Sequence, residues 1–229
     1  MVTGASQGIG RAIARALAAE GCHVILAARN LSKLKSLQKE LDREKVRVLA
    51  IACDVSDPVS VGELFAAVKK QFRRLDILVN NAGVGHAGLA VNELPVAAWQ
   101  EAIETNLTGL FLVTEAALPL MRKPAAIVNN LSIAAKKVFP GSSAYNASKH
   151  GALAFTNSLR EELRERGIRV IALLPGATDT EIWQTLWPTA PRKKMMSAET
   201  VAKATVNALS TPDDGVIEEL IVRPMAGTL

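Results

Sequence analysis

A chain of 229 residues with 49% hydrophobic and 21% charged side chains can bury one large core, which excludes an intrinsically disordered protein. The two cysteines are too few for a disulfide framework, and neither they nor the three histidines show a metal-ligand spacing, so we expect no metal site. The net charge of +5 is spread over scattered basic residues, and only 4% of side chains are aromatic, so no nucleic-acid partner is expected.

The sequence shows no pattern for a membrane protein or for secretion. No apolar run approaches the ~20 residues that a membrane span requires, and the chain opens directly into a glycine-rich turn instead of a signal peptide. A cytoplasmic protein is therefore predicted. Met1 and Val2 resemble the end of a buried strand, which leaves open whether the chain was trimmed or begins upstream.

Apolar segments of strand length alternate with amphipathic helical patterns from one end of the chain to the other. After the strand ending at Val2, strands are predicted at His23–Ala28, Val46–Cys53, Ile77–Asn80, Ala126–Leu131, Arg169–Leu174 and Ile217–Val222. Helices are predicted at Ile9–Ala19, Leu31–Arg43, Pro58–Phe72, Trp99–Met121, Tyr145–Arg166 and Ala198–Ala208. This alternation predicts a doubly wound parallel sheet of the Rossmann type, as a single domain over residues 1–229.

One long segment, Ala177–Met196, shows no regular pattern and carries Trp183 and Trp187. Irregular segments of this length within compact domains are usually lids or binding loops. We expect it to cover part of a functional site.

The turn between the first strand and the first helix has the composition of a diphosphate-binding loop. Its glycines permit a tight turn and close approach of the backbone to a ligand, and the following helix presents free N–H groups to an anion. The predicted cofactor-binding residues here are Gly4, Ser6, Gln7, Gly8, Ile9 and Gly10.

Arg29 and Asn30 stand at the end of the second strand, where dinucleotide-binding proteins that prefer NAD carry an acidic residue for the ribose hydroxyl. A guanidinium can instead pair with a 2′-phosphate. NADP(H) is therefore the predicted cofactor.

Two further strands end at the same edge of the predicted sheet. Asp54 and Val55 follow the third strand, and Asp54 could contact adenine or cap the next turn equally well. After the fourth strand, the small residues of the segment Asn81-Ala82-Gly83 let backbone approach the cofactor. All five are predicted to line the nucleotide site.

Tyr145 is the only tyrosine of the chain, and Lys149 follows it by one helical turn, on the same face of the predicted helix. Ser132 follows the preceding strand, so its hydroxyl can reach the same place. Reduction of a carbonyl develops an alkoxide that needs a proton donor and a hydrogen-bond donor. We expect Tyr145 to supply the proton, Ser132 the hydrogen bond, and Lys149 a positive charge that lowers the pKa of the tyrosine.

Together these residues resemble the compact, single-domain short-chain dehydrogenases. The resemblance rests on Thr-Gly-x-x-x-Gly-x-Gly at residues 3–10, Asn80-Asn81-Ala82-Gly83, Asn106, Ser132, Tyr145-x-x-x-Lys149 and Pro175-Gly176, in this order over the whole chain. It implies that Asn106 is a fourth catalytic residue, holding a water in a proton relay behind Lys149, and that Tyr145 and Lys149 also contact the cofactor. The same resemblance assigns cofactor contacts to Pro175, Gly176, Thr178 and Thr180.

Two positions depart from the family pattern. Gln7 stands where many NADP-using relatives carry a basic residue. The segment before Ser132 reads Asn129-Asn130-Leu131, where Asn-x-Ser is usual before the catalytic serine.

The predicted function is hydride transfer between NADP(H) and a ketone or secondary alcohol, for example as a ketoreductase of the 3-oxoacyl or 3-hydroxy acid type. A non-catalytic NADP-binding regulator is the alternative, whereas nucleotide-sugar epimerases of similar fold need a longer chain. Expected walls of the substrate pocket are His86, Ile133, Phe139, Trp183 and Trp187, which favour an apolar or aromatic ketone.

A homodimer or homotetramer is also predicted. The helices within Asn106–Met121 and Tyr145–Arg166 are expected to pack against symmetry mates, because their outer faces are rich in apolar residues. These residues include Leu110, Leu153, Ala154 and Phe155.

Overall fold

The computed structural model describes residues 1–212 and 214–227; residues 213 and 228–229 of the predicted domain lie outside the described residues. Its centre is a seven-stranded parallel sheet with the strand order β3-β2-β1-β4-β5-β6-β7. The strands are β1 (Val2–Thr3), β2 (Val24–Ala28), β3 (Val48–Ala52), β4 (Ile77–Asn80), β5 (Ala125–Asn130), β6 (Ile168–Pro175) and β7 (Glu219–Val222). The order reverses direction between β1 and β4, which confirms the doubly wound sheet.

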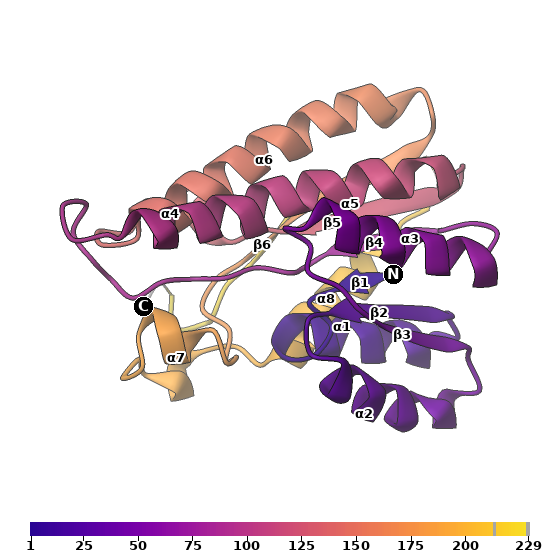
Figure 1. Ribbon diagram of the computed structural model, residues 1–229, viewed down its shortest axis with the longest axis horizontal. Coiled ribbons are helices and arrows are strands. Elements are labelled where there is room, and N and C mark those ends of the chain that lie inside the picture. Colours follow the sequence, from indigo (N-terminus) through magenta and orange to yellow (C-terminus); the bar gives the residue numbers. More distant parts are fainter. Residues whose placement is uncertain (213, 228–229) are drawn as a thin grey trace.

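Helices cover both faces of this sheet (Figure 1). On one face lie α1 (Gly8–Ala19), α2 (Leu31–Leu41) and α8 (Ala198–Leu209), which share a core with the strands. The other face carries α3 (Pro58–Gln71), α4 (Val96–Ile103), α5 (Gly109–Ala117) and α6 (Ser143–Arg164), and α3, α5 and α6 contribute to a second core. The sheet is thus buried on both sides, as its near-continuous apolar strands predict.

The side chains of strand β2 alternate between these two cores. All five of its residues are buried. Val24, Leu26 and Ala28 belong to the core under α1 and α2, whereas Ile25 and Ala27 belong to the core under α3 and α5. Successive residues of a strand point to opposite faces, so a strand between two helical layers must be apolar throughout.

The predicted helix Trp99–Met121 is interrupted in the structure. It begins earlier, with α4 after Pro95, passes through a π-helical turn at Glu104–Thr108, and continues as α5. A single 3₁₀ turn, Leu118–Leu120, closes it. Such π-helical turns insert one extra residue and are frequent at functional sites; here the turn contains Asn106, whose side chain is buried.

The segment Ala177–Met196 is more ordered than its sequence indicates. It contains the short helix α7 (Trp183–Leu186) and a 3₁₀ turn at Arg192–Lys194. A parallel bridge between Thr178 and Met196 closes its base. In Figure 1, α7 stands beyond the sheet edge, away from the helical layers.

One prediction about the surface is wrong. Leu110 is only 8% exposed and packs in a core cluster with Leu131 and Leu174, so it does not belong to the outer face of its helix. The exposed side chain of this turn is Phe111, at 48%. Within the described residues, no helix is both long and apolar enough to cross a membrane.

Candidate active site

A cavity of about 530 Å³ runs along the carboxyl edge of the sheet, from the glycine-rich turn to α7. Its lining includes eighteen of the twenty-one predicted site residues: Gly4, Ser6, Gln7, Gly8, Ile9, Arg29, Asp54, Val55, Asn81, Ala82, Gly83, Ser132, Tyr145, Lys149, Pro175, Gly176, Thr178 and Thr180. The remaining three, Gly10, Asn30 and Asn106, do not line it. Residues spread over most of the chain therefore meet in one cavity because the carboxyl ends of parallel strands share an edge.

The glycine-rich turn leaves the N-terminus of α1 open toward this cavity. Gly4 and Gly8 both have positive φ, at 62° and 54°, a conformation that side-chain-bearing residues rarely adopt. No side chain caps α1, and its first turn contains no acidic residue. Free N–H groups and the positive end of the helix dipole thus face the cavity, the arrangement that binds phosphate.

Gly10 and Asn81 explain why the turn packs so closely on β4. A Cβ atom at Gly10 would lie 2.2 Å from the Asn81 Nδ2, so only glycine fits there. Asn81 Nδ2 donates to the carbonyl oxygen of Thr3 at 3.0 Å, and Thr3 Oγ1 accepts hydrogen bonds from the backbone of Asn81 and Ala82. Gly10 is therefore a packing residue behind the cavity.

At the outer end of the cavity, Arg29 is exposed and lines the wall. Asn30 does not line it; its side chain caps α2 by accepting a hydrogen bond from the Lys33 backbone at 3.0 Å. The Lys33 Nζ in turn donates to Gln7 Oε1 at 2.9 Å. A second cation therefore stands at the rim, beside Gln7, where this chain lacks the basic residue that many NADP-using relatives carry.

Sequence reasoning missed Lys33. The available signal was a lysine in the first turn of a helix, where a positive charge opposes the helix dipole. Among the described residues, neither Arg29 nor Lys33 forms an ion pair with a carboxylate.

Asp54 shapes the next turn and also lines the cavity. It lines the cavity, and its Oδ1 accepts hydrogen bonds from the backbone and hydroxyl of Ser56, which shape the turn before α3. Burial raises the pKa of this carboxyl, but the Ser56 hydrogen bonds and the charge of Arg29 outweigh it, so the pKa is lowered overall. Asp54 is therefore an ionised acceptor at the cavity wall at neutral pH.

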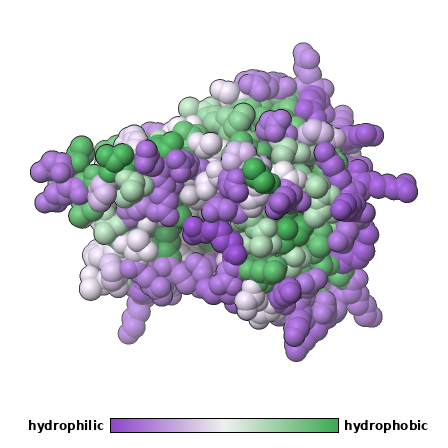
Figure 2. All heavy atoms as spheres, viewed as in Figure 1, coloured by the Kyte–Doolittle hydropathy of each residue, from purple (hydrophilic) through white to green (hydrophobic). Residues whose placement is uncertain are grey.

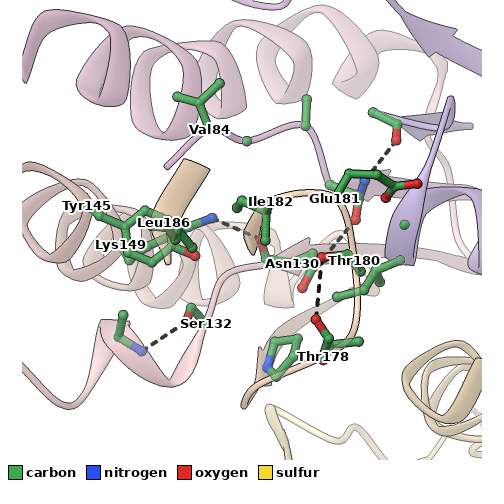
Figure 3. A pocket seen from close by; sticks show the side chains of 18 of the residues that line it. Val84, Asn130, Ser132, Tyr145, Lys149, Thr178, Thr180, Glu181, Ile182 and Leu186 are labelled. Carbon is green, nitrogen blue, oxygen red and sulfur yellow. Dashed lines mark hydrogen bonds between the residues drawn. The ribbon is translucent and has the colours of Figure 1, made fainter. Parts of the chain in front are cut away.

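Three side chains converge at the inner end of the cavity (Figure 3). Tyr145 and Lys149 lie one turn apart on α6, with the Lys149 Nζ 5.6 Å from the centre of the tyrosine ring. Ser132 follows β5 and hydrogen-bonds with Tyr145, while its Oγ also accepts from the Ala134 backbone at 3.1 Å. Lys149 Nζ donates to the carbonyl oxygen of Asn130 at 3.4 Å.

Burial controls the protonation of this cluster. It lowers the pKa of Lys149 to about 8. It also raises the pKa of Tyr145, and the hydrogen bond from Ser132 offsets only part of this rise. The expected lowering of the tyrosine pKa by Lys149 is therefore wrong for the free protein, because the loss of solvation at the phenol outweighs the favourable contacts of its charged form.

Asn106 lies behind this cluster instead of lining the cavity. Its Oδ1 accepts from the Val84 backbone at 2.8 Å, and its Nδ2 donates to the Val84 carbonyl oxygen and to Ser148 Oγ, both at 3.0 Å. A Cβ atom at Gly83 would lie 3.1 Å from Asn106 Oδ1 and 3.6 Å from Lys149 Nζ. Asn106 and Lys149 thus flank the glycine that follows β4.

Near α7 the cavity is lined by apolar side chains. Its wall here is formed by Val84, Leu131, Ile133, Phe139, Ile182, Trp183, Leu186 and Trp187. Leu186 packs on Gly85, where a Cβ atom would lie 2.6 Å from the leucine side chain. The prediction for His86 is wrong, since this residue is not part of the wall. Ile133, Phe139, Trp183 and Trp187 line the cavity, as predicted, and their contact with a substrate stays a prediction.

Comparison with known proteins agrees with this geometry. The sequence pattern of the family described as short chain dehydrogenase matches residues 1–191. The chain belongs to this family. An uncharacterized oxidoreductase of Staphylococcus aureus (strain USA300) is 34% identical over 227 residues, which cover 98% of this chain and 96% of that protein.

Two solved structures share the fold over the whole chain. One is an alcohol dehydrogenase from the archaeon Thermococcus sibiricus complexed with 5-hydroxy-NADP, with a TM-score of 0.93, 32% identity, and coverage of 100% of this chain and 97% of that one. The other is an actinorhodin polyketide ketoreductase with NADPH, with a TM-score of 0.89, 32% identity, and coverage of 100% and 96%. The family and the fold predicted from the sequence are therefore confirmed.

Proposed function

We propose that this short-chain dehydrogenase is an NADP(H)-dependent carbonyl reductase or alcohol dehydrogenase that acts on a neutral, largely apolar ketone or secondary alcohol. One observation carries the proposal: Tyr145, Ser132 and Lys149 meet at one end of a cavity whose other end holds the open N-terminus of α1 and Arg29. A nucleotide that fills this cavity would place its reactive end beside the tyrosine. The matched structures with NADP-type ligands support this choice of cofactor.

The residues of the outer half of the cavity fit NADP(H). The backbone from Gly4 to Ile9 and the α1 N-terminus would bind the diphosphate, and Arg29 with Lys33 would face the 2′-phosphate. Further inward, the nicotinamide half would lie against the small residues Asn81-Ala82-Gly83 and the segment 175–180. When bound, the cofactor supplies or accepts the hydride.

Each side chain of the inner cluster has a role in the proposed reaction. Tyr145 donates its proton to the developing alkoxide, and Ser132 donates a hydrogen bond to the same oxygen. Lys149 would present its positive charge beside the ring of Tyr145 and would contact the ribose of a bound cofactor. Asn106 holds the loop at Val84 in place, beside the lysine. In the oxidative direction, the ionised tyrosine accepts the alcohol proton.

The lining under α7 supports a neutral substrate. In the described residues, the charged side chains of the wall are Arg29, Asp54, Lys149 and Glu181. None of them belongs to the apolar region under α7, and the Glu181 carboxylate lies beside the glycine-rich turn, 3.5 Å from where a Cβ atom at Gly8 would stand. No cation there can pair with a free carboxylate. Among 3-oxo compounds, esters and thioesters should therefore be accepted over the free acids.

The test is NADPH oxidation against aryl ketones, 3-keto esters and the matching free 3-oxo acids. Turnover of the first two classes, with the free acids at least tenfold slower in kcat/KM, is expected; this threshold corresponds to about 1.4 kcal/mol. Tight NADPH binding without turnover of any carbonyl compound would instead support the non-catalytic regulator.

We also propose that the protein is a homodimer or homotetramer in the cytoplasm. On the face shown in Figure 2, hydrophobic residues reach the surface between hydrophilic side chains. Phe111 of α5 is 48% exposed and forms an edge-to-face pair with Phe155 of α6, with ring centres 6.1 Å apart. An exposed phenylalanine supported by a partly buried one on the adjacent helix is suited to packing against the same pair of a second copy.

A further inference from the structure

Asn130 is the last residue of β5. Its hydrogen bonds connect the glycine-rich turn to Lys149, a connection that the backbone hydrogen bonds of the sheet do not make. The ladder between β4 and β5 ends at the pair Asn80 and Asn129. One residue further, Asn130 Nδ2 donates a 2.7 Å hydrogen bond to Asn81 Oδ1. This side-chain bond extends the contact between the two strands to the point where they meet the cavity.

Asn81 carries this connection onward to the glycine-rich turn. Its Nδ2 donates to the carbonyl oxygens of Thr3 at 3.0 Å and Gly4 at 3.3 Å. The amide also fills the space that a side chain at Gly10 would need. A displacement of Asn81 would therefore disturb the turn that we expect to hold the diphosphate.

On its other side, Asn130 holds Lys149 (Figure 3). The Lys149 side chain is 5% exposed, and the hydrogen bond of its Nζ within the described residues goes to the backbone carbonyl of Asn130. Tyr145 is the titratable group beside this ammonium, and no charged group contributes to the lowered pKa of Lys149. The position of the Asn130 carbonyl therefore determines how well the charged lysine is solvated.

The polarity of Asn130 disfavours folding. The residue is 9% exposed, and its Oδ1 is buried without a hydrogen-bond partner. A buried, unpaired acceptor destabilises a protein relative to an apolar side chain of similar shape. An asparagine at such a place, on the wall of the cavity, indicates a role other than stability.

We propose that Asn130 is a positioning residue that couples the glycine-rich turn to Lys149, so that the ammonium stands at a fixed place relative to a bound dinucleotide. This inference rests on the proposed function. Asn130 acts through Asn81 and Lys149 and exchanges no proton itself.

Asn130→Leu tests the coupling, with Thr114→Val as the matched control. Thr114 accepts a 2.9 Å hydrogen bond from Asn80 Nδ2 deeper between β4 and α5, and it does not line the cavity. NADPH affinity is measured by fluorescence titration, the ionisation of Lys149 by the pH profile of kcat/KM, and stability by thermal unfolding. If Asn130→Leu does not fold, Asn130→Ala is compared with Thr114→Val by the same measurements.

In Asn130→Leu, the NADPH dissociation constant should rise by about threefold to tenfold, the effect of one net hydrogen bond. The alkaline limb of the pH profile should move to lower pH, because a less well placed carbonyl stabilises the charged lysine less. Thr114→Val should lower the unfolding temperature and leave the NADPH affinity and the pH profile unchanged. The rise in the NADPH dissociation constant caused by Asn130→Leu should also be smaller when Asn81→Ala is already present.

An Asn130→Leu variant with unchanged NADPH affinity and an unchanged pH profile would overturn the coupling, whatever its thermal stability. The coupling would also be overturned if Asn81→Ala and Asn130→Leu had additive effects on the NADPH affinity. If the unmodified protein binds NADPH but reduces no carbonyl, the proposed function fails, while the binding titration and the double variant still decide the role of Asn130.

Discussion

Lys33 and Gln7, separated by 26 positions in the sequence, are joined by a 2.9 Å hydrogen bond at the outer rim of the cavity. This contact places the lysine ammonium beside the position where many NADP-using relatives carry a basic residue. A phosphate monoester carries about −1.5 to −2 charge at neutral pH, more than Arg29 alone neutralises. Lys33 therefore supplies a second positive charge from a different element.

The first prediction concerns cofactor preference. NADPH should be preferred over NADH by more than about tenfold, since a charge-assisted contact contributes roughly 1.5 to 3 kcal/mol. Arg29→Asp should reverse this preference, so that NADH becomes the better cofactor, and Lys33→Ala should make the preference for NADPH smaller. Lys35→Ala, an exposed change on the same helix, is the control and should have no effect. Calorimetric binding of 2′,5′-ADP and 5′-AMP measures the preference without turnover, and equal kcat/KM for both cofactors in the unmodified enzyme would contradict it.

The second prediction concerns the proton donor. Tyr145→Phe retains the ring but removes the hydroxyl, so kcat should fall by at least ~10²-fold, the lower range of general acid catalysis. NADPH binding should persist, because the glycine-rich turn and Arg29 are unchanged. Ser132→Ala should lower kcat to a lesser extent, with cofactor affinity nearly constant. A Tyr145→Phe enzyme that binds NADPH and keeps more than a tenth of the original kcat would exclude this role.

The third prediction concerns the effect of Lys149 on stability. Its pKa is lowered from 10.5 to about 8, so the unfolded chain binds more protons between these two values and stability rises with pH across this window. Below pH 8 the folded protein carries the full cost of the buried charge, about 3 kcal/mol. Lys149→Met should therefore raise the unfolding temperature at pH 7 by roughly 6–12 °C while abolishing turnover. The difference in unfolding temperature between Lys149→Met and the unmodified protein should shrink as the pH rises from 8 to 10. A variant that unfolds at the same or a lower temperature than the unmodified protein at pH 7 would contradict this prediction.

The fourth prediction concerns the pH dependence of activity. The kcat/KM for ketone reduction should decline above about pH 8, where Lys149 of the free enzyme loses its charge. Tyr145, with its raised pKa, stays protonated through this range and remains a proton donor. Alcohol oxidation, which needs the ionised tyrosine, should instead increase toward alkaline pH. A reductive profile that is flat between pH 7 and 9 would show that Lys149 does not limit the rate in this range.

The fifth prediction concerns assembly. Light scattering should give a multiple of the 24.4 kDa chain mass at micromolar concentration. Phe111→Glu should dissociate the assembly, because it places a charge at the centre of the expected contact. Val138→Glu changes a side chain that is 70% exposed on a loop and is the control. A monomeric mass for the unmodified protein would contradict the prediction.

The sequence by itself determined the fold and most of the cavity wall. Strands such as β2 are apolar on both faces, and the glycine-rich turn, Tyr145 and Lys149 follow from local spacing. These features depend on neighbours within a few positions, and the parallel sheet then brings the strand ends to one edge. Residues predicted from that rule meet in the cavity even where the element boundaries differ by a few positions.

Only the tertiary structure decided what depends on contacts between distant segments. The bond from Lys33 to Gln7, the link from Asn130 to Asn81 and the enclosure of Asn106 by Val84 and Ser148 all join residues at least 22 positions apart. The rise of the Tyr145 pKa and the burial of Leu110 likewise follow from packing around each side chain. Side-chain hydrogen bonding and desolvation depend on distance in space, which periodicity along the chain does not encode.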